Sequence, residues 1–262
     1  MLHYKIIENN SSTEWVTFLH GAGGSSAIWF KQIKAFSEKY NLLLLDLRGH
    51  GKSQNLEVPK ENYTFPLLCN DVFQVLDFLK IKTSHFVGIS LGTLIIRHLE
   101  EIQPNRVKTM VLGGAITALS NPSKLLLFSA HILKPILPST LLYKVFANII
   151  LPLRNHKESR TIFIQESKRL TKQEFSRWFM LTKNLQSRLD YFFKTQAVSP
   201  SFYVMGDQDF FFLETVKKMV VNNPTNNQLA VIKNCGHVTN IEHAEEFNKL
   251  VLNYFRHKKI GV

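Results

Sequence analysis

The 262-residue sequence predicts an α/β fold in which a mostly parallel central sheet is flanked by helices. Short apolar runs bounded by turn-forming residues alternate with amphipathic segments over residues 1–115, and the same alternation resumes at residue 199. Over residues 116–198 no clear strand pattern is present, and helix-forming residues interrupted by prolines prevail. We therefore expect a core formed by residues 1–115 and 199–262, with a helical insertion over residues 116–198.

The N-terminal part of the core contains short apolar runs, of which Leu42-Leu43-Leu44-Leu45 is typical of a parallel strand buried on both faces. Asn9-Asn10-Ser11-Ser12 is a cluster of turn formers and predicts a hairpin between the first two strands. Helices are expected where apolar residues recur at helical spacing, as Trp29, Ile33 and Phe36 do. The expected strands are 2–7, 15–19, 42–45, 83–87 and 107–112, and the expected helices are 27–40, 65–79 and 91–103.

The C-terminal part of the core repeats this pattern. Strands are expected at 201–205 and 228–232, with a helix at 213–221 between them. The closing segment places its apolar residues on one helical stripe, which fits docking of a last helix on the sheet. This stripe consists of Phe247, Leu250, Val251, Tyr254 and Phe255.

Composition and charge narrow the class of protein. Hydrophobic residues make up 45% and charged residues 20% of the chain, which is typical of a globular protein. Cys69 and Cys235 form neither a disulfide framework nor a metal-ligand pattern, and they favour a reducing compartment. The N-terminus lacks the apolar core of a signal peptide, and no apolar run is long enough to span a bilayer. We expect a cytoplasmic protein without a metal site.

The most informative stretch is Gly88-Ile89-Ser90-Leu91-Gly92, which joins an expected strand to an expected helix. A serine in so tight a turn is forced into an unfavourable backbone conformation that pushes its hydroxyl out of the sheet. Small residues two positions before and after it let the strand and the helix approach closely. The helix N-terminus beside it favours developing negative charge. Ser90 is therefore a candidate nucleophile.

Three further polar loops follow expected strands: His20-Gly21-Ala22-Gly23-Gly24, Gly206-Asp207-Gln208-Asp209 and Asn234-Cys235-Gly236-His237. The carboxyl ends of parallel strands lie along one edge of a sheet, where ligands bind. A serine, an acid and a base can meet there although they are far apart in the sequence. His237 is the candidate base because it follows the last strand, and Asp207 and Asp209 are both candidate acids.

These motifs, in the order H-G-A-G-G, D-L-R-G-H-G-K-S, G-I-S-L-G, G-D-Q-D and C-G-H, resemble a capped α/β-hydrolase of the serine-esterase type over essentially the whole length. The resemblance implies an α/β-hydrolase fold with a helical cap inserted after the sixth strand. It implies a catalytic triad of Ser90, His237 and Asp209, with Asp207 as a neighbour that caps a helix or braces the loop. It also implies an oxyanion hole formed by the backbone N–H groups of Ala22 and Leu91.

The function expected from this resemblance is hydrolysis of a carboxylic ester through an acyl-enzyme on Ser90, with no metal or organic cofactor. Apolar residues between Leu125 and Leu137 predict a pocket for an apolar acyl group. Thioester hydrolysis, perhydrolysis and C–C bond cleavage can use the same triad. In an alternative from another functional class, the protein binds a ligand and has no catalytic activity. Nucleic-acid binding would rest on the charge alone, since no nucleic-acid motif is present.

The net charge of +12 is unevenly distributed. Residues 116–199 contain 13 lysines and arginines against four acidic residues, so +9 of the net charge lies in the expected cap. Basic residues beside apolar helices are suited to an anionic membrane surface. We therefore expect a weak, reversible association of the cap with acidic lipid, at the inner surface of the membrane.

Overall fold

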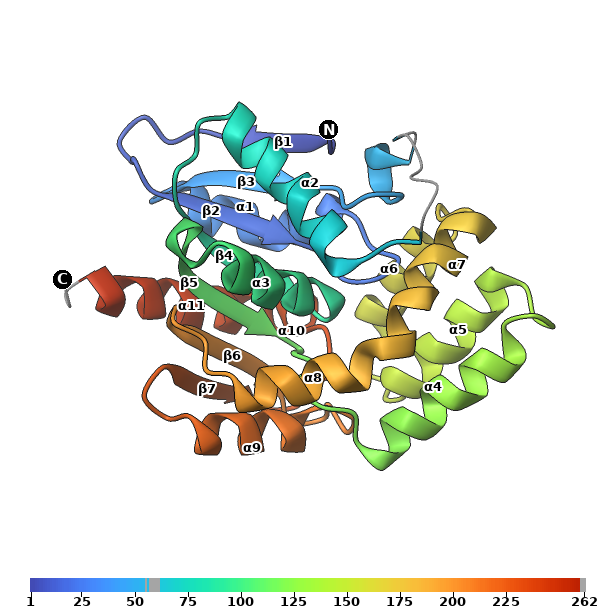
Figure 1. The fold of residues 1–262 in the computed structure, drawn as a ribbon. Helices are drawn as coiled ribbons and strands as arrows, with labels where there is room; N and C mark the ends of the chain where they lie inside the picture. The colour runs from blue at the N-terminus through green and yellow to red at the C-terminus, as the bar shows by residue number, and fades with distance from the viewer. Residues whose placement is uncertain (55, 57–61, 260–262) are drawn as a thin grey trace.

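The structure, a computed structural model, describes residues 1–54, 56 and 62–259. Its centre is a seven-stranded sheet in the order β1-β3-β2-β4-β5-β6-β7 (Figure 1). All neighbouring strands are parallel except β1, which runs antiparallel to β3. The strands are β1 Tyr4–Ile7, β2 Trp15–Leu19, β3 Asn41–Leu45, β4 Ser84–Ile89, β5 Val107–Gly113, β6 Ser201–Gly206 and β7 Asn227–Ile232.

Helices connect the strands and cover both faces of the sheet. The α-helices are α1 Phe30–Ser37, α2 Phe65–Phe78, α3 Leu91–Ile102, α4 Asn121–Leu133, α5 Ser139–Ile150, α6 Lys157–Ser167, α7 Lys172–Met180, α8 Leu185–Lys194, α9 Leu213–Asn222, α10 Thr239–Glu242 and α11 Ala244–Lys259. Short 3-10 helices occur at Ser26–Trp29, Gly51–Ser53, Pro104–Arg106 and Leu181–Asn184. The α/β-hydrolase fold expected from the sequence is confirmed.

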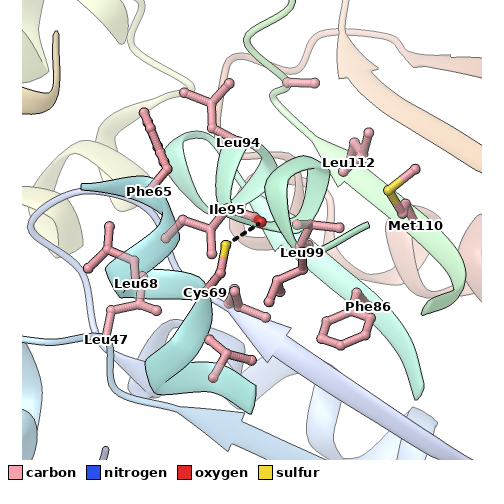
Figure 2. Close-up of a cluster of buried hydrophobic side chains, with 14 of the residues drawn as sticks. Leu47, Phe65, Leu68, Cys69, Phe86, Leu94, Ile95, Leu99, Met110 and Leu112 are labelled. Carbon is pink, nitrogen blue, oxygen red and sulfur yellow. Dashed lines mark hydrogen bonds between the residues drawn. The ribbon is translucent and has the colours of Figure 1, made fainter. Parts of the chain in front are cut away.

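Two apolar layers hold the sheet, because successive residues of a strand point to opposite faces. In β3, Leu43 and Leu45 pack in the layer shared with α2, α3 and α9, whereas Leu42 and Leu44 pack in the layer shared with α1 and α11. Figure 2 shows part of the first layer, where the Cys69 thiol on α2 faces a backbone carbonyl of α3. Both cysteines are free and buried.

The expected hairpin between the first two strands is wrong. The turn at residues 9–12 forms, with the Ser12 N–H donating to the Asn9 carbonyl at 2.9 Å, but β1 pairs with β3. Both edges of β2 are already taken by the parallel partners β3 and β4. β1 therefore pairs with the free edge of β3, the strand next to β2.

The helical segment expected as a cap contains α4 to α8 and lies between β5 and β6. This segment follows β5, the fifth strand of the chain, and not a sixth strand as expected. The count is lower by one because only β1 and β2 precede α1, the first helix that connects two parallel strands. Part of this segment has its own apolar cluster, made of Ala130, Leu142, Tyr143, Leu170, Phe175 and Phe179. Trp178 and Leu189, from α7 and α8, pack instead with the main core. The division into core and cap remains a prediction.

Within the described residues, no helix has both the length and the apolar character needed to cross a bilayer.

Candidate active site

Ser90 occupies the turn between β4 and α3 in an unusual backbone conformation. Its φ of 53° and ψ of −122° lie outside the regions that side-chain-bearing residues favour, a conformation that costs about 1–3 kcal/mol. The Ser90 N–H donates to the Gly113 carbonyl at 2.9 Å, and the Ser90 carbonyl accepts from the Thr93 N–H at 2.9 Å. A Cβ at Gly92 would lie 2.4 Å from the Leu19 carbonyl oxygen, so the turn needs glycine there.

The structure brings Ser90, His237 and Asp209 together. His237 Nε2 lies 2.9 Å from Ser90 Oγ, and His237 Nδ1 lies 2.8 Å from Asp209 Oδ2. The other carboxylate oxygen of Asp209 accepts the Phe212 N–H at 3.2 Å. Asp207 is exposed and instead accepts the Cys235 N–H at 3.2 Å. Of the two candidate acids, only Asp209 contacts the histidine.

The surroundings of His237 favour its protonated form. Burial by itself lowers the pKa of the imidazole. The charge of Asp209 and its hydrogen bond raise it, and the charge of Glu242 adds to this, so that the pKa of His237 lies above its ordinary value of 6.5. A buried base with a raised pKa holds a proton more readily when one is transferred to it.

Glu242 is a residue that the sequence reasoning missed. Its carboxylate accepts the Gly236 N–H at 2.7 Å and the Val238 N–H at 3.3 Å, which are the N–H groups of the residues directly before and after His237. It also accepts the Ser159 hydroxyl of α6 at 2.9 Å, which ties the helical segment to this loop. The available signal was an acidic residue in the short helix directly after the histidine. Glu242 therefore helps to hold His237 in place.

The loop after β2 is held by two buried histidines. His50 Nε2 accepts the Gly23 N–H at 2.9 Å, and His20 Nε2 accepts the Leu47 N–H at 3.0 Å. Burial is the main cause that lowers the pKa of both, to about 3 for His50. Both side chains are therefore neutral at physiological pH and can accept these hydrogen bonds. Neither histidine is among the site residues expected from the sequence, although His20 begins the H-G-A-G-G motif and His50 lies in the D-L-R-G-H-G motif.

Ala22 and Leu91 line the same cavity as Ser90. Leu91 is the first residue of α3, where backbone N–H groups have no partner within the helix. In the part of the chain that the structure describes, neither N–H has a hydrogen-bond acceptor. Both donors are thus available to a ligand beside Ser90, and their assignment as an oxyanion hole remains a prediction.

A cavity of about 240 Å³ opens at Ser90 between the sheet edge and the helical segment. Its walls are mainly apolar and come from α4, α5, α6 and α7, with side chains such as Leu127, Phe146 and Phe163. Among the described lining residues, Glu166 carries the only carboxylate and there is no lysine or arginine. Glu166 accepts the Ser25 hydroxyl at 2.5 Å. The site thus joins a serine–histidine–aspartate chain to an apolar cavity that has no lysine or arginine among its described lining residues.

No cluster of three or more histidine, cysteine, aspartate or glutamate side chains suited to a metal ion occurs among the described residues.

Known proteins share this fold and sequence pattern. A family profile described as the alpha/beta hydrolase fold matches residues 14–137. A 2-hydroxy-6-oxononadienedioate/2-hydroxy-6-oxononatrienedioate hydrolase from Burkholderia vietnamiensis is 26% identical over 275 residues, covering 97% of this chain and 91% of the relative. A 3-oxoadipate enol-lactonase from Acinetobacter baylyi is 37% identical over 100 residues, covering 38% of this chain and 36% of the relative. The solved structure of a hydrolase from Oleispira antarctica covers 97% of this chain and 94% of its own, with a TM-score of 0.84 and 15% identity.

The fold and the site define a hydrolase of the α/β type. The chain has the α/β-hydrolase fold, and the profile and the relatives show that it is similar to hydrolases of the α/β-hydrolase superfamily.

Proposed function

We propose that the protein hydrolyses carboxylic esters with an apolar acyl group through an acyl-enzyme on Ser90. The observation that carries the proposal is the continuous chain from Ser90 Oγ through His237 to Asp209, which opens into an apolar cavity. A serine hydroxyl needs a base to become a good nucleophile, and the base needs a partner that fixes its tautomer. These two requirements are met by His237 and Asp209.

In the acylation step, Ser90 Oγ attacks the ester carbonyl carbon while its proton passes to His237 Nε2. Asp209 accepts the Nδ1–H and stabilises the imidazolium that forms. The carbonyl oxygen becomes an oxyanion and accepts the N–H groups of Ala22 and Leu91, a contact typically worth about 3–4 kcal/mol for each donor. The tetrahedral intermediate then collapses, the C–O bond to the alcohol breaks, and His237 gives its proton to the leaving alcohol.

Deacylation repeats these steps with water. His237 takes a proton from the water as the water oxygen attacks the acyl carbon, and the oxyanion again forms between the two N–H groups. When this intermediate collapses, the bond to Ser90 Oγ breaks and His237 returns the proton to the serine. The products are the free acid and the regenerated enzyme, so the cycle consumes one ester and one water.

The cavity favours a neutral, apolar acyl group over an anionic one. Its mainly apolar walls lower the free energy of an alkyl or aryl chain that leaves water. A substrate carboxylate would instead be buried without a lysine or arginine among the described lining residues, and it would face Glu166. Burial of an unpaired charge is costly.

A second candidate is hydrolysis of a C–C bond in a 2-hydroxy-6-oxo acid, which uses the same three side chains. It is favoured by the Burkholderia vietnamiensis relative, whose name gives such a dioate as its substrate and whose alignment covers nearly the whole chain. The lack of a lysine or arginine among the described cavity-lining residues weighs against a dioate. A thioester or peracid reaction has no observation of its own in its favour.

The test begins with a fluorophosphonate probe followed by peptide mapping, which we expect to locate the label on Ser90. A panel of p-nitrophenyl esters from acetate to laurate should show kcat/KM rising with chain length until the cavity is full. Ser90→Ala should lose both labelling and turnover while it keeps the circular dichroism of the wild type. A wild-type protein that takes no label and cleaves no ester would overturn the proposal. Faster turnover of a 2-hydroxy-6-oxodienoate than of any ester would favour the second candidate.

A further inference from the structure

The outermost helices of the molecule expose a set of large apolar side chains. This outer cap face is defined by Leu125, Phe128, Ile132, Ile136, Leu141 and Ile149. On α4, Leu125, Phe128 and Ile132 follow one another at intervals of three and four residues, so they lie on one side of the helix. Both α4 and α5 lie at the edge of the molecule away from β1 to β4 (Figure 1). Large apolar side chains exposed together on one side of a helix indicate an interaction surface.

The same two helices are apolar on their inner side. Leu126 and Leu127 of α4 and Phe146 and Ala147 of α5 line the cavity that opens at Ser90. A surface helix of a globular protein normally has one apolar stripe that faces the core and a polar stripe that faces water. These helices present apolar side chains in both directions. Packing against the core therefore accounts for only one of their two faces.

The charged residues of α4, of α5 and of the segment that joins them all have one sign. The chain contains no acidic residue from position 102 to position 157, a span that includes both helices. The basic side chains of residues 116–157 are Lys124, Lys134, Lys144, Arg154 and Lys157. Within the described part of the chain, none of these five forms a salt bridge. Lys124 lies one helical turn from Phe128, so positive charge and exposed apolar area occur side by side.

We propose that the outer cap face docks on an anionic lipid bilayer. Apolar side chains flanked by lysines can enter the boundary between headgroups and acyl chains while the ammonium groups remain among lipid phosphates. A second copy of the chain fits less well, because two such faces would bring like charges together. A neutral bilayer would offer the apolar contact without the electrostatic attraction.

Docking in this orientation would place the helices that line the cavity at the lipid boundary. If the proposed function holds, a lipid-like ester could then pass from the membrane to Ser90 without crossing bulk water. The docking itself needs no catalysis, so it is tested separately from the esterase activity.

The test is co-sedimentation of the whole protein with vesicles of phosphatidylcholine and with vesicles that also contain about 30% phosphatidylglycerol. We expect clear preference for the anionic vesicles at low salt, and weaker binding as salt rises, because charge is screened over about 8 Å at physiological ionic strength. Equal binding to both kinds of vesicle, or binding to neither, would overturn the proposal.

The decisive variant is Phe128→Ser, with Phe78→Ser as its matched control. Phe128 is 64% exposed on α4, and Phe78 is 63% exposed on α2, away from the cap. Phe128→Ser should weaken binding to anionic vesicles about tenfold, whereas Phe78→Ser should leave it unchanged. Lys124→Glu should weaken it by a similar factor only at low salt.

Phe128 does not line the cavity, so Phe128→Ser should turn over p-nitrophenyl acetate as fast as the wild type. Unchanged turnover also shows that the variant is folded. Equal effects of Phe128→Ser and Phe78→Ser would contradict the docking surface. So would a wild-type dimer in solution that Phe128→Ser splits into monomers, since the face would then be occupied by a second copy.

Discussion

Replacing Ser90 by glycine should stabilise the fold relative to replacing it by alanine, although both variants lose the hydroxyl. At φ 53° and ψ −122°, any residue with a Cβ is strained, by about 1–3 kcal/mol. Ser90→Ala keeps the Cβ and therefore keeps the strain. Ser90→Gly removes it, because glycine adopts positive φ at little cost.

The magnitude follows from two opposing contributions. Relief of strain is worth about 1–3 kcal/mol, and the greater freedom of glycine in the unfolded chain costs about 0.5–1 kcal/mol. Ser90→Gly should therefore have a free energy of unfolding up to about 2.5 kcal/mol higher than Ser90→Ala, with about 1 kcal/mol as the middle of the range. In a chain of this size, each kcal/mol corresponds to about 2–4 °C in Tm.

Urea unfolding and calorimetry of the two variants measure this difference. The control is the same pair of substitutions at Ser129, within α4, where glycine should be less stable than alanine by about 1 kcal/mol. At position 90 the glycine variant should thus be more stable than the alanine variant, and at position 129 it should be less stable. If Ser90→Gly is the less stable variant, as at Ser129, the backbone at position 90 is not strained and the argument fails.

Three further results are expected. Asp209→Asn should lower kcat by about four orders of magnitude, because the imidazole loses the partner that fixes its tautomer, while Asp207→Asn should have a mild effect; the reverse order would make Asp207 the acid. The kcat/KM of the wild type should rise with pH through a pKa above 6.5, as His237 loses its proton. Glu242→Gln should shift this rise to lower pH, because it removes a negative charge that favours the imidazolium. An unchanged pH profile would show that Glu242 has no such effect on His237. Gly92→Ala should destabilise the fold by about 1–3 kcal/mol or more in urea unfolding, since the added Cβ would lie 2.4 Å from a carbonyl oxygen of β2, and wild-type stability would show that the turn has room for it.

Local patterns in the sequence were enough to predict the fold class and most strands and helices of the core, but not the individual helices of residues 116–198. The apolar run Leu42–Leu45 and the alternation of strand and helix patterns reflect which side chains face the core, and this spacing is visible without knowing the partners. The turn at Ser90 could be predicted for the same reason, because its requirements concern immediate neighbours in the chain. The resemblance to the α/β-hydrolases then implied which motifs belong together, and the fold that it implied is confirmed.

Only the tertiary structure decided which groups meet. The pairing of β1 with β3 depends on which strand edges are free once the parallel strands are in place. The choice between Asp207 and Asp209 as the neighbour of His237 depends on how the loop after β6 turns at the sheet edge, and spacing along the chain leaves both open. Glu242 and its contacts with the loop of His237 also appear only when the chain is folded, because a hydrogen bond such as that to Ser159 joins positions 83 residues apart. Sequence patterns report burial and turn chemistry over a few residues, whereas a site is made of contacts that the packing of the whole chain creates.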